Sequence, residues 1–248
     1  MRILGIIPAR FASSRFPGKP LIDIGGKSMI ERVYAQAKKS SQLNRVIIAT
    51  DNQQIFNHVS EKGCEVLMTS PDHVSGTDRC AEALTLIKEP FDYVVNIQGD
   101  EPFIDPKQID LLASLFDGET ELATLVKKIT NQETLFSSNI VKVVANNRNQ
   151  AIYFSRSPIP HVRNIPEADW MKKHTFYKHI GMYGYRADIL KEITLLKPSG
   201  LEVAESLEQL RWIENGYIIK IAETEIETMG IDSPEDLDRA LDYLKKIS

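Results

Sequence analysis

Cysteine is scarce in this sequence. Cys64 and Cys80 are the only two among 248 residues, and they lack the CxxC spacing of a metal or redox motif. Two cysteines are too few for a disulfide framework, so we expect two reduced thiols. No apolar run approaches the roughly 18 residues that a membrane-spanning helix needs, and the first residues show no signal-peptide pattern. These absences predict a cytoplasmic chain with no membrane partner.

Excess positive charge and a dinucleotide-binding loop are missing too. The net charge is -4, whereas a nucleic-acid partner favours a basic surface, so no nucleic acid is expected. No GxGxxG follows the first apolar segment, which disfavours an NAD-dependent dehydrogenase. Gly26, Lys27 and Ser28 imitate the end of a P-loop, but Leu21 stands where that motif needs its first glycine. A turn before a helix is the simpler interpretation.

Short segments rich in Ile and Val alternate with longer amphipathic segments from the first residue onward. Strands are predicted at residues 3–8, 45–50, 93–98, 121–129, 140–145, 151–155, 179–185 and 217–222. Helices are predicted at residues 28–39, 53–62, 77–88, 106–115, 187–195, 201–215 and 234–246. The continuously apolar first strands are typical of a sheet covered on both faces. The alternation favours a Rossmann-like three-layer α/β/α fold with a mostly parallel mixed sheet.

The alternation of strands and helices changes between about residues 140 and 184, where strands follow one another with few helices between them. The pattern predicts one domain over residues 1–248, with an inserted antiparallel portion at roughly 130–200. In an open α/β sheet, ligands bind beyond the carboxyl ends of the strands. The candidate site therefore lies in the loops at 8–20, 50–52 and 98–102, and after residues 183 and 228.

The loop after the first strand carries three cations, Arg10, Arg15 and Lys19. Arginine offers a planar fork for phosphate oxygens, and lysine a movable point charge. Small residues between them let backbone N–H groups approach an anion. An exposed charged loop is the alternative, but the position of the loop at a strand end favours a triphosphate site.

Two carboxylates follow apolar segments far apart in the sequence. Asp100 lies in NIQGDEP at residues 96–102, and Asp232 lies just before the last predicted helix. Mg²⁺ typically takes one or two protein carboxylates, together with waters and substrate phosphates. The ordinary alternatives are a strand-ending turn for the first and a helix cap for the second. Together the two carboxylates predict a Mg²⁺ site.

The motif SGTDR at residues 75–79 begins a predicted helix. Hydroxyls and free N–H groups at a helix start suit hydrogen bonds to a base or a ribose. A plain helix cap explains the same residues equally well.

The second half of the chain holds a further polar group. Arg156 and His179 suit a sugar carboxylate. In the predicted helix 201–215, four side chains recur at spacings of three to four and share one face: Glu202, Glu205, Glu208 and Gln209. A structural histidine and a solvated acidic face are the ordinary alternatives.

Taken together, these motifs resemble one family, the CMP-KDO synthetases or 3-deoxy-manno-octulosonate cytidylyltransferases. The resemblance runs nearly end to end: IIPAR…SSRFPGKPL, IATD, SGTDR, NIQGDEP, VKVV, YFSRSPIP, KHIGMYGYR, LEQLR and GIDSPEDL. The opening loop is shared by acid-sugar cytidylyltransferases in general. YFSRSPIP, HIGMYGYR and LEQLR are much more specific to the branch that uses 3-deoxy-manno-octulosonate (KDO).

The resemblance implies a nucleotide-diphospho-sugar transferase fold whose insertion forms a homodimer. It also implies transfer of CMP from CTP to the anomeric 2-hydroxyl of KDO, for lipopolysaccharide synthesis, with Mg²⁺ as cofactor. Arg10, Arg15 and Lys19 would hold the triphosphate, and Asp100 and Asp232 the metal. The implied cytidine contacts are Ser75, Gly76, Arg79 and Gln98. The implied sugar contacts are Arg156, His179, Tyr183, Glu208 and Gln209.

Alternatives remain open on the sequence alone. The same chemistry on sialic acid or an amino analogue of KDO keeps the fold and changes only the sugar. A nucleotide-binding module without catalysis would keep the loops and release no pyrophosphate. No residue can be assigned as a general base from the sequence. One hypothesis is that the metal lowers the pKa of the attacking hydroxyl, so that no general base is needed.

Overall fold

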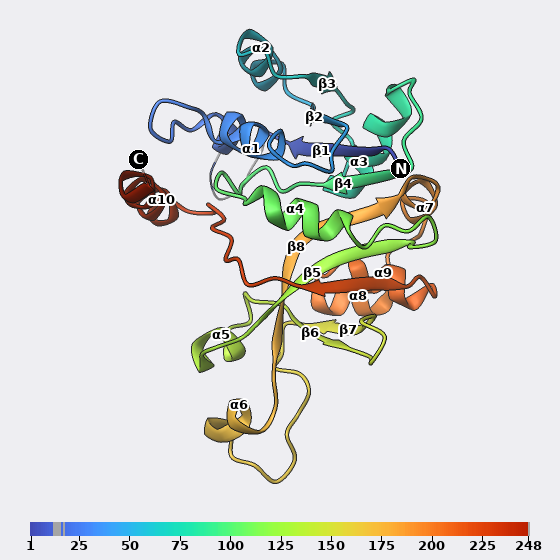
Figure 1. Ribbon diagram of the computed structural model, residues 1–248, viewed down its shortest axis with the longest axis vertical. Helices are drawn as coiled ribbons and strands as arrows, with labels where there is room; N and C mark the ends of the chain where they lie inside the picture. Colours follow the sequence, from blue (N-terminus) through green and yellow to red (C-terminus); the bar gives the residue numbers. More distant parts are fainter. Residues whose placement is uncertain (12–15, 17, 248) are drawn as a thin grey trace. The chain divides into compact units, whose positions relative to one another are not determined.

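The computed structural model describes residues 1–11, 16 and 18–247 (Figure 1). These residues form two compact units. Unit 1 comprises Met1–Ala113 and Glu227–Ser248, and unit 2 comprises Ser114–Ile226. Unit 2 begins before and ends after the insertion expected at 130–200. A single domain with an insertion stays a prediction.

Unit 1 alternates strands with helices. Its strands are β1 (Ile3–Ala9), β2 (Arg45–Thr50), β3 (Val66–Met68) and β4 (Tyr93–Asn96). Its helices are α1 (Met29–Ala37), α2 (Gln53–Glu61), α3 (Gly76–Leu86), α4 (Pro106–Ala113) and α10 (Pro234–Ile247), with a short 3₁₀ turn at Lys19–Leu21. The sequence pattern missed β3, because this strand has only three residues and none of them is buried.

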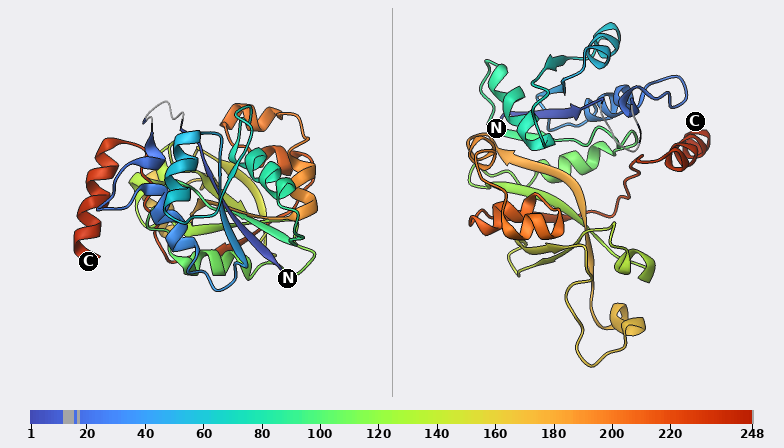
Figure 2. Two further views of the ribbon diagram at one scale, coloured as in Figure 1. Left: turned by 90° about the horizontal axis from the view of Figure 1, so that it is seen from above. Right: turned by 180° about the vertical axis from the view of Figure 1, so that it is seen from behind.

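The strands of unit 1 run in the order β3-β2-β1-β4, and each neighbouring pair is parallel. Right-handed crossovers place α1 and α2 on one face and α3 on the other, because the strand order reverses at β1 (Figure 2). The side chains of β4 are all buried, as a doubly covered sheet requires. The reversal at β1 opens a crevice at the carboxyl ends of β1 and β4.

Side-chain caps fix where the helices of unit 1 begin. Ser28 forms a capping box with Glu31 at the start of α1, and Ser75 forms one with Asp78 at the start of α3. Gly25 and Gly26 both have positive φ, which confirms a turn before Ser28 rather than a P-loop.

The last helix belongs to unit 1 although residues 114–226 separate it from the rest. Ala240 of α10 packs in a buried cluster with Ile24, Met29 and Ile231. The Ile231 N–H also donates to the Asp100 carbonyl at 3.0 Å. The loop before α10 is thereby fixed against the loop after β4.

Unit 2 holds the remaining elements. Its strands are β5 (Leu122–Lys128), β6 (Lys142–Ala145), β7 (Ala151–Ser155), β8 (Tyr177–Arg186) and β9 (Ile219–Glu223). Its helices are α5 (Gln132–Phe136), α6 (Trp170–Lys173), α7 (Ala187–Ile193), α8 (Gly200–Glu205) and α9 (Gln209–Glu214), with a 3₁₀ turn at Glu167–Asp169. Here β5 pairs with β8 antiparallel and with β9 parallel, and β6 pairs antiparallel with β7 and β8.

The predicted helix 201–215 is wrong. Ser206 adopts the left-handed conformation at φ 53° and ends α8, and α9 begins only at Gln209. Glu202, Glu205, Glu208 and Gln209 therefore do not share one helix face. Helical spacing in the sequence could not reveal this break, because serine has no strong preference for the left-handed region.

The mixed α/β class with a mostly parallel sheet is confirmed, and the antiparallel pairs fall in the second half as expected. A small buried cluster in unit 2 joins segments on both sides of β7, in which Trp170 and Phe176 pack with Ile129 and Leu135. No helix in the described part of the chain is both long and apolar enough to cross a membrane.

Gly99 gives a first prediction. A Cβ atom at this position would lie 2.7 Å from the Pro8 carbonyl oxygen, which is backbone and cannot move aside cheaply. We expect Gly99→Ala to lower the free energy of unfolding by about 1–3 kcal/mol, as overpacking does. Urea unfolding measures this change. Gly181→Ala is the control, since its Cβ would meet nothing within 4 Å. Equal stability of the two variants would contradict the prediction.

Candidate active site

A pocket of about 370 Å³ lies in unit 1 at the carboxyl ends of β1 and β4. Its lining residues are Pro8, Ala9, Arg10, Lys19, Pro20, His73, Val74, Ser75, Gly76, Arg79, Gln98, Gly99, Asp100 and Asp232. The structure thus brings together all the predicted triphosphate, cytidine and metal residues except Arg15. Arg15 lies outside the described residues.

Lys19 links the two predicted metal ligands. Its Nζ atom lies 2.8 Å from Asp100 Oδ2 and 2.8 Å from Asp232 Oδ1, and its side chain is only 12% exposed. Burial by itself lowers the pKa of Lys19, but the two carboxylates outweigh it and raise that pKa above its usual value. The ammonium group therefore stays charged. Carboxylates 132 positions apart in sequence converge on this one cation.

The same carboxylates fit a magnesium ion. Both are oxygen donors that already share one cation, and each is partly exposed to the pocket. The described residues contain no group of three or more His, Cys, Asp or Glu side chains with metal-site spacing. Mg²⁺ needs no such group, since waters and substrate phosphates complete its shell. The donor set fits Mg²⁺ bound together with a triphosphate.

Glu101, next to Asp100, was given no role from the sequence. Its Oε2 atom is buried and has no hydrogen-bond partner within the described residues. Burial and the Asp100 charge raise the pKa of Glu101 to about 7, and a hydrogen bond with Thr228 opposes the rise. Its place in the motif NIQGDEP is the only signal of this residue in the sequence. With a pKa of about 7, this carboxyl group is only about half ionised at neutral pH.

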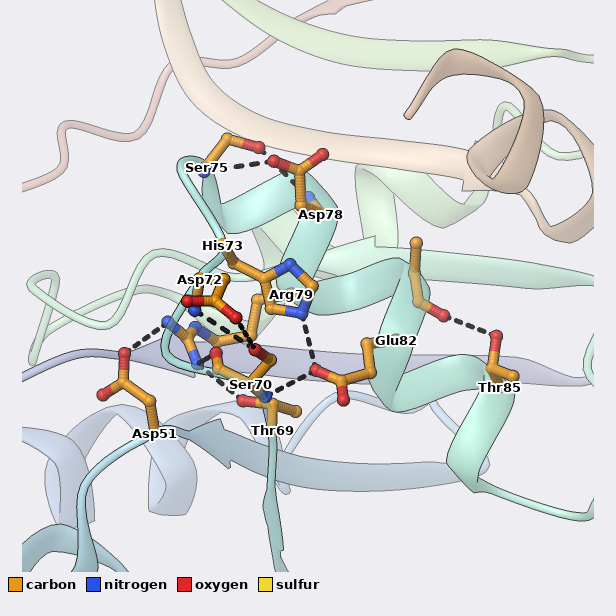
Figure 3. Close-up of polar contacts among 11 residues, drawn as sticks. Asp51, Thr69, Ser70, Asp72, His73, Ser75, Asp78, Arg79, Glu82 and Thr85 are labelled. Carbon is orange, nitrogen blue, oxygen red and sulfur yellow. Dashed lines mark hydrogen bonds and ion pairs between the residues drawn. The ribbon is translucent and has the colours of Figure 1, made fainter. Parts of the chain in front are cut away.

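The buried Arg79 side chain is held by protein partners (Figure 3). Its Nη2 atom donates to Asp51 Oδ2 at 2.6 Å, and its Nη1 atom donates to the Thr69 hydroxyl at 2.6 Å. The side chain is 3% exposed. Removing one partner of such a buried pair typically costs about 3–5 kcal/mol. Arg79 thus supports the wall of the pocket, and its contact with cytidine stays a prediction.

Ser75 confirms the helix-cap alternative. Its hydroxyl accepts the Asp78 N–H at 3.1 Å, and its own N–H donates to Asp78 Oδ2 at 3.3 Å. Ser75 also lines the pocket beside Gly76 and Gln98. The cap fixes this edge of the pocket, and the predicted cytidine contacts stay predictions.

His73 is a pocket residue that the sequence reading missed (Figure 3). Its Nε2 atom lies 2.5 Å from Glu82 Oε2, and the same oxygen accepts the Ser70 N–H at 2.8 Å. Burial opposes ionisation of Glu82, but these two contacts outweigh it and hold the pKa of Glu82 below its usual value. No motif signalled the pair, because its two members lie in different elements.

Arg156, predicted to contact the sugar, lies at the end of β7 in unit 2. Its Nε atom donates to the Glu205 carbonyl at 2.8 Å, and its backbone N–H donates to Glu205 Oε2 at 2.9 Å. Further guanidinium bonds reach the Ser138 and Ser206 carbonyls. These bonds fix the guanidinium beside the α8–α9 junction, where Glu208 and Gln209 follow.

His179 and Tyr183, from β8, lie together in unit 2 with ring centroids 5.1 Å apart. The Tyr183 hydroxyl is buried and has no hydrogen-bond partner within the described residues. Burial raises the pKa of Tyr183 well above its ordinary value, and the nearby Glu208 charge adds to the rise. Gln209 is 5% exposed. The predicted sugar residues therefore gather in two adjoining groups of unit 2.

His179 gives a prediction about pH. Its Nε2 atom hydrogen-bonds the Thr124 hydroxyl at 2.9 Å, and Phe154 packs edge-on against its ring. Burial lowers the pKa of His179 to about 3, against about 6.5 for a free histidine. The unfolded chain therefore takes up the proton first as pH falls below 6.5, and stability falls with it.

We expect His179→Gln to remove about 1–2 kcal/mol of the stability lost between pH 7 and pH 5. Urea unfolding across this range measures the slope. Val33→Ala, a cavity variant in the buried face of α1, is the control and should leave the slope unchanged. An unaltered slope in His179→Gln would show that the folded protein binds this proton readily.

Comparison with known proteins identifies the family. The cytidylyltransferase family model matches residues 4–226. A 3-deoxy-manno-octulosonate cytidylyltransferase of Cytophaga hutchinsonii is 56% identical over 95% of this chain and 94% of its own length. Its namesake in Parabacteroides distasonis is 56% identical over 98% of each chain.

Solved structures agree with this result. A CMP:2-keto-3-deoxy-manno-octonic acid synthetase complexed with CTP superposes with a TM-score of 0.93, at 39% identity over the whole of both chains. A glucose-1-phosphate thymidylyltransferase from Bacillus anthracis, described as putative, has a TM-score of 0.67 at 19% identity over 99% of this chain and 96% of its own. That second likeness shows the fold alone. With near-complete coverage by relatives 56% identical, and with the described triphosphate, cytidine and metal candidates of its motifs lining one pocket, this chain belongs to the 3-deoxy-manno-octulosonate cytidylyltransferase family.

Proposed function

We propose that this chain transfers CMP from CTP to the anomeric 2-hydroxyl of 3-deoxy-manno-octulosonate and releases pyrophosphate, as a step in lipopolysaccharide synthesis. The observation that carries the proposal is the convergence of Lys19, Asp100 and Asp232 in a pocket that Arg10 also lines. A cationic pair for phosphates and a carboxylate pair for a metal are what nucleotidyl transfer requires. The relatives named above supply the choice of nucleotide and sugar.

The reaction joins two anions that repel each other, so positioning and charge neutralisation would supply most of the catalysis. Lys19 and Arg10 would bind the triphosphate and stabilise the charge that develops on the departing pyrophosphate. Asp100 and Asp232 would hold Mg²⁺, which when bound neutralises phosphate charge and lowers the pKa of a coordinated hydroxyl. Lys19 is held in place by the same two carboxylates. Because the Lys19 ammonium is already ordered before the substrates bind, aligning them with it would cost less entropy.

The sugar would bind to residues of unit 2. Tyr183 supports this assignment, since a buried hydroxyl without a partner costs about 1–3 kcal/mol until a ligand satisfies it. Arg156 brings a positive charge suited to the sugar carboxylate. Glu208 and Gln209 would accept and donate hydrogen bonds with sugar hydroxyls.

The decisive experiment measures pyrophosphate release from CTP and Mg²⁺ with KDO as acceptor. Sialic acid and an amino analogue of KDO are the comparison acceptors. We expect KDO to be used much faster than either. Faster turnover of another acid sugar would show that KDO is not the preferred acceptor. CTP binding without pyrophosphate release in the presence of any of these sugars would leave only a nucleotide-binding module. Omission of Mg²⁺ from the same assay tests the metal requirement.

The homodimer expected from the sequence is part of this proposal. Unit 2 exposes apolar side chains, among them Ile152 at 53% and Val203 at 69% exposure, and such surface suits a second copy. Sedimentation velocity of the purified protein gives the mass directly, and a monomer at micromolar concentration would contradict the dimer. The cytoplasmic location expected from the sequence stays a prediction.

A further inference from the structure

His73 and Glu82 form a hydrogen-bonded pair (Figure 3), and His73 lines the pocket. Glu82 lies on α3, and His73 lies in the loop that leads into that helix. A single carboxylate oxygen, Oε2, accepts both the His73 ring N–H and the Ser70 backbone N–H. Glu82 on α3, a helix capped by Ser75, therefore holds the imidazole ring in place. His73 itself lines the pocket.

The contact with Glu82 determines what the other ring nitrogen can do. A carboxylate accepts hydrogen bonds, so Nε2 carries the proton, and Nδ1 of the neutral ring is then an acceptor. The structure gives Nδ1 no hydrogen-bond partner among residues 1–11, 16 and 18–247. An acceptor in the pocket wall selects for a donor on the ligand.

We propose that His73, oriented by Glu82, recognises the nucleoside half of CTP through Nδ1. The inference rests on the proposed function only in taking CTP as the ligand of this pocket. Phosphate oxygens are acceptors, so the triphosphate offers Nδ1 nothing. The donors on CTP are the amino group of cytosine and the ribose hydroxyls. Either kind of donor would form a hydrogen bond to Nδ1. Glu82 acts as a positioning residue for the ring.

Two substitutions of His73 distinguish a role in binding CTP from a purely structural role. Glutamine places its amide near the Nε2 position and keeps the Glu82 bond, whereas asparagine places its amide near Nδ1 and loses that bond. We expect His73→Gln to raise the Kd for CTP about three- to tenfold, the typical effect of one hydrogen bond, and His73→Asn to raise it less. Calorimetric titration without sugar measures both. A purely structural histidine would give the reverse order, with His73→Asn also the less stable variant.

Glu82 provides a second test that does not depend on His73 variants folding. Glu82→Gln retains one side-chain oxygen for both bonds, so it should bind CTP as the unaltered protein does. Glu82→Ala frees the ring and should weaken binding as His73→Gln does, raising KM for CTP more than it lowers kcat. The control is His58→Gln, because His58 also contacts a glutamate, Glu31, at 3.1 Å but lies outside the pocket lining.

Nucleotide analogues identify the donor. If it is the cytosine amino group, His73→Gln loses affinity for CTP but not for UTP. If it is a ribose hydroxyl, the loss vanishes with 2′-deoxy-CTP or 3′-deoxy-CTP. Unchanged CTP binding in His73→Gln, or an equal loss with all four nucleotides, overturns the proposal. An unaltered protein that binds CTP but transfers CMP to no acid sugar would end the proposed function and leave this inference standing.

Discussion

Asp100→Asn is expected to lower kcat at least about a hundredfold at saturating CTP and sugar, since even the outer partners of a metal ligand change activity 10- to 100-fold. The substitution keeps the size of the side chain and removes the negative charge that would draw Mg²⁺. It also removes one of the two carboxylates that hold the Lys19 ammonium at 2.8 Å. Because the Asp100 carbonyl accepts the Ile231 N–H, the backbone arrangement should survive.

Steady-state rates at increasing Mg²⁺ concentration measure this effect. Asp100→Asn should need much more Mg²⁺ for half-maximal rate, which a loss of folding alone would not cause. Asp23→Asn is a matched control, since Asp23 caps a turn through Gly26 and does not line the pocket. Full turnover of Asp100→Asn at saturating Mg²⁺ would show that Asp100 is not a metal ligand.

Lys19→Met should lower kcat/KM for CTP by about 10²–10³, the range seen when one preorganised charge-stabilising donor is lost. Methionine fills a similar volume without the charge. The raised pKa of Lys19 means that the ammonium is present throughout the working pH range. Its loss leaves Asp100 and Asp232 without their common cation.

A second result should accompany the loss of activity. With Lys19 absent, the two carboxylates repel each other, so added Mg²⁺ should raise Tm more in Lys19→Met than in the unaltered protein. Thermal unfolding with and without Mg²⁺ measures this difference. Lys27→Met is the control, because Lys27 is exposed and outside the pocket lining. An equal Mg²⁺ response in all three proteins would contradict a metal site between these carboxylates.

Much of the fold followed from local chemistry. Continuous apolar runs predicted β1, β2 and β4. The helix starts predicted at Ser28 and at the SGTDR motif are present in the structure, where Ser28 and Ser75 are the N-caps. The helix predicted at 201–215 failed at Ser206, whose left-handed conformation comes from its surroundings rather than from its own preference. The small core around Trp170 in unit 2 was not predicted, because it joins segments distant in sequence.

The sequence by itself determined the family of this protein and the loops that line the candidate site, since motif residues and strand ends can be identified along the chain. The tertiary structure decided which charges meet. It brought Asp100 and Asp232 to one lysine, assigned Arg79 to Asp51, and placed His73 against Glu82. Hydrogen bonds between different elements depend on how strands and helices pack, and no spacing rule encodes that packing.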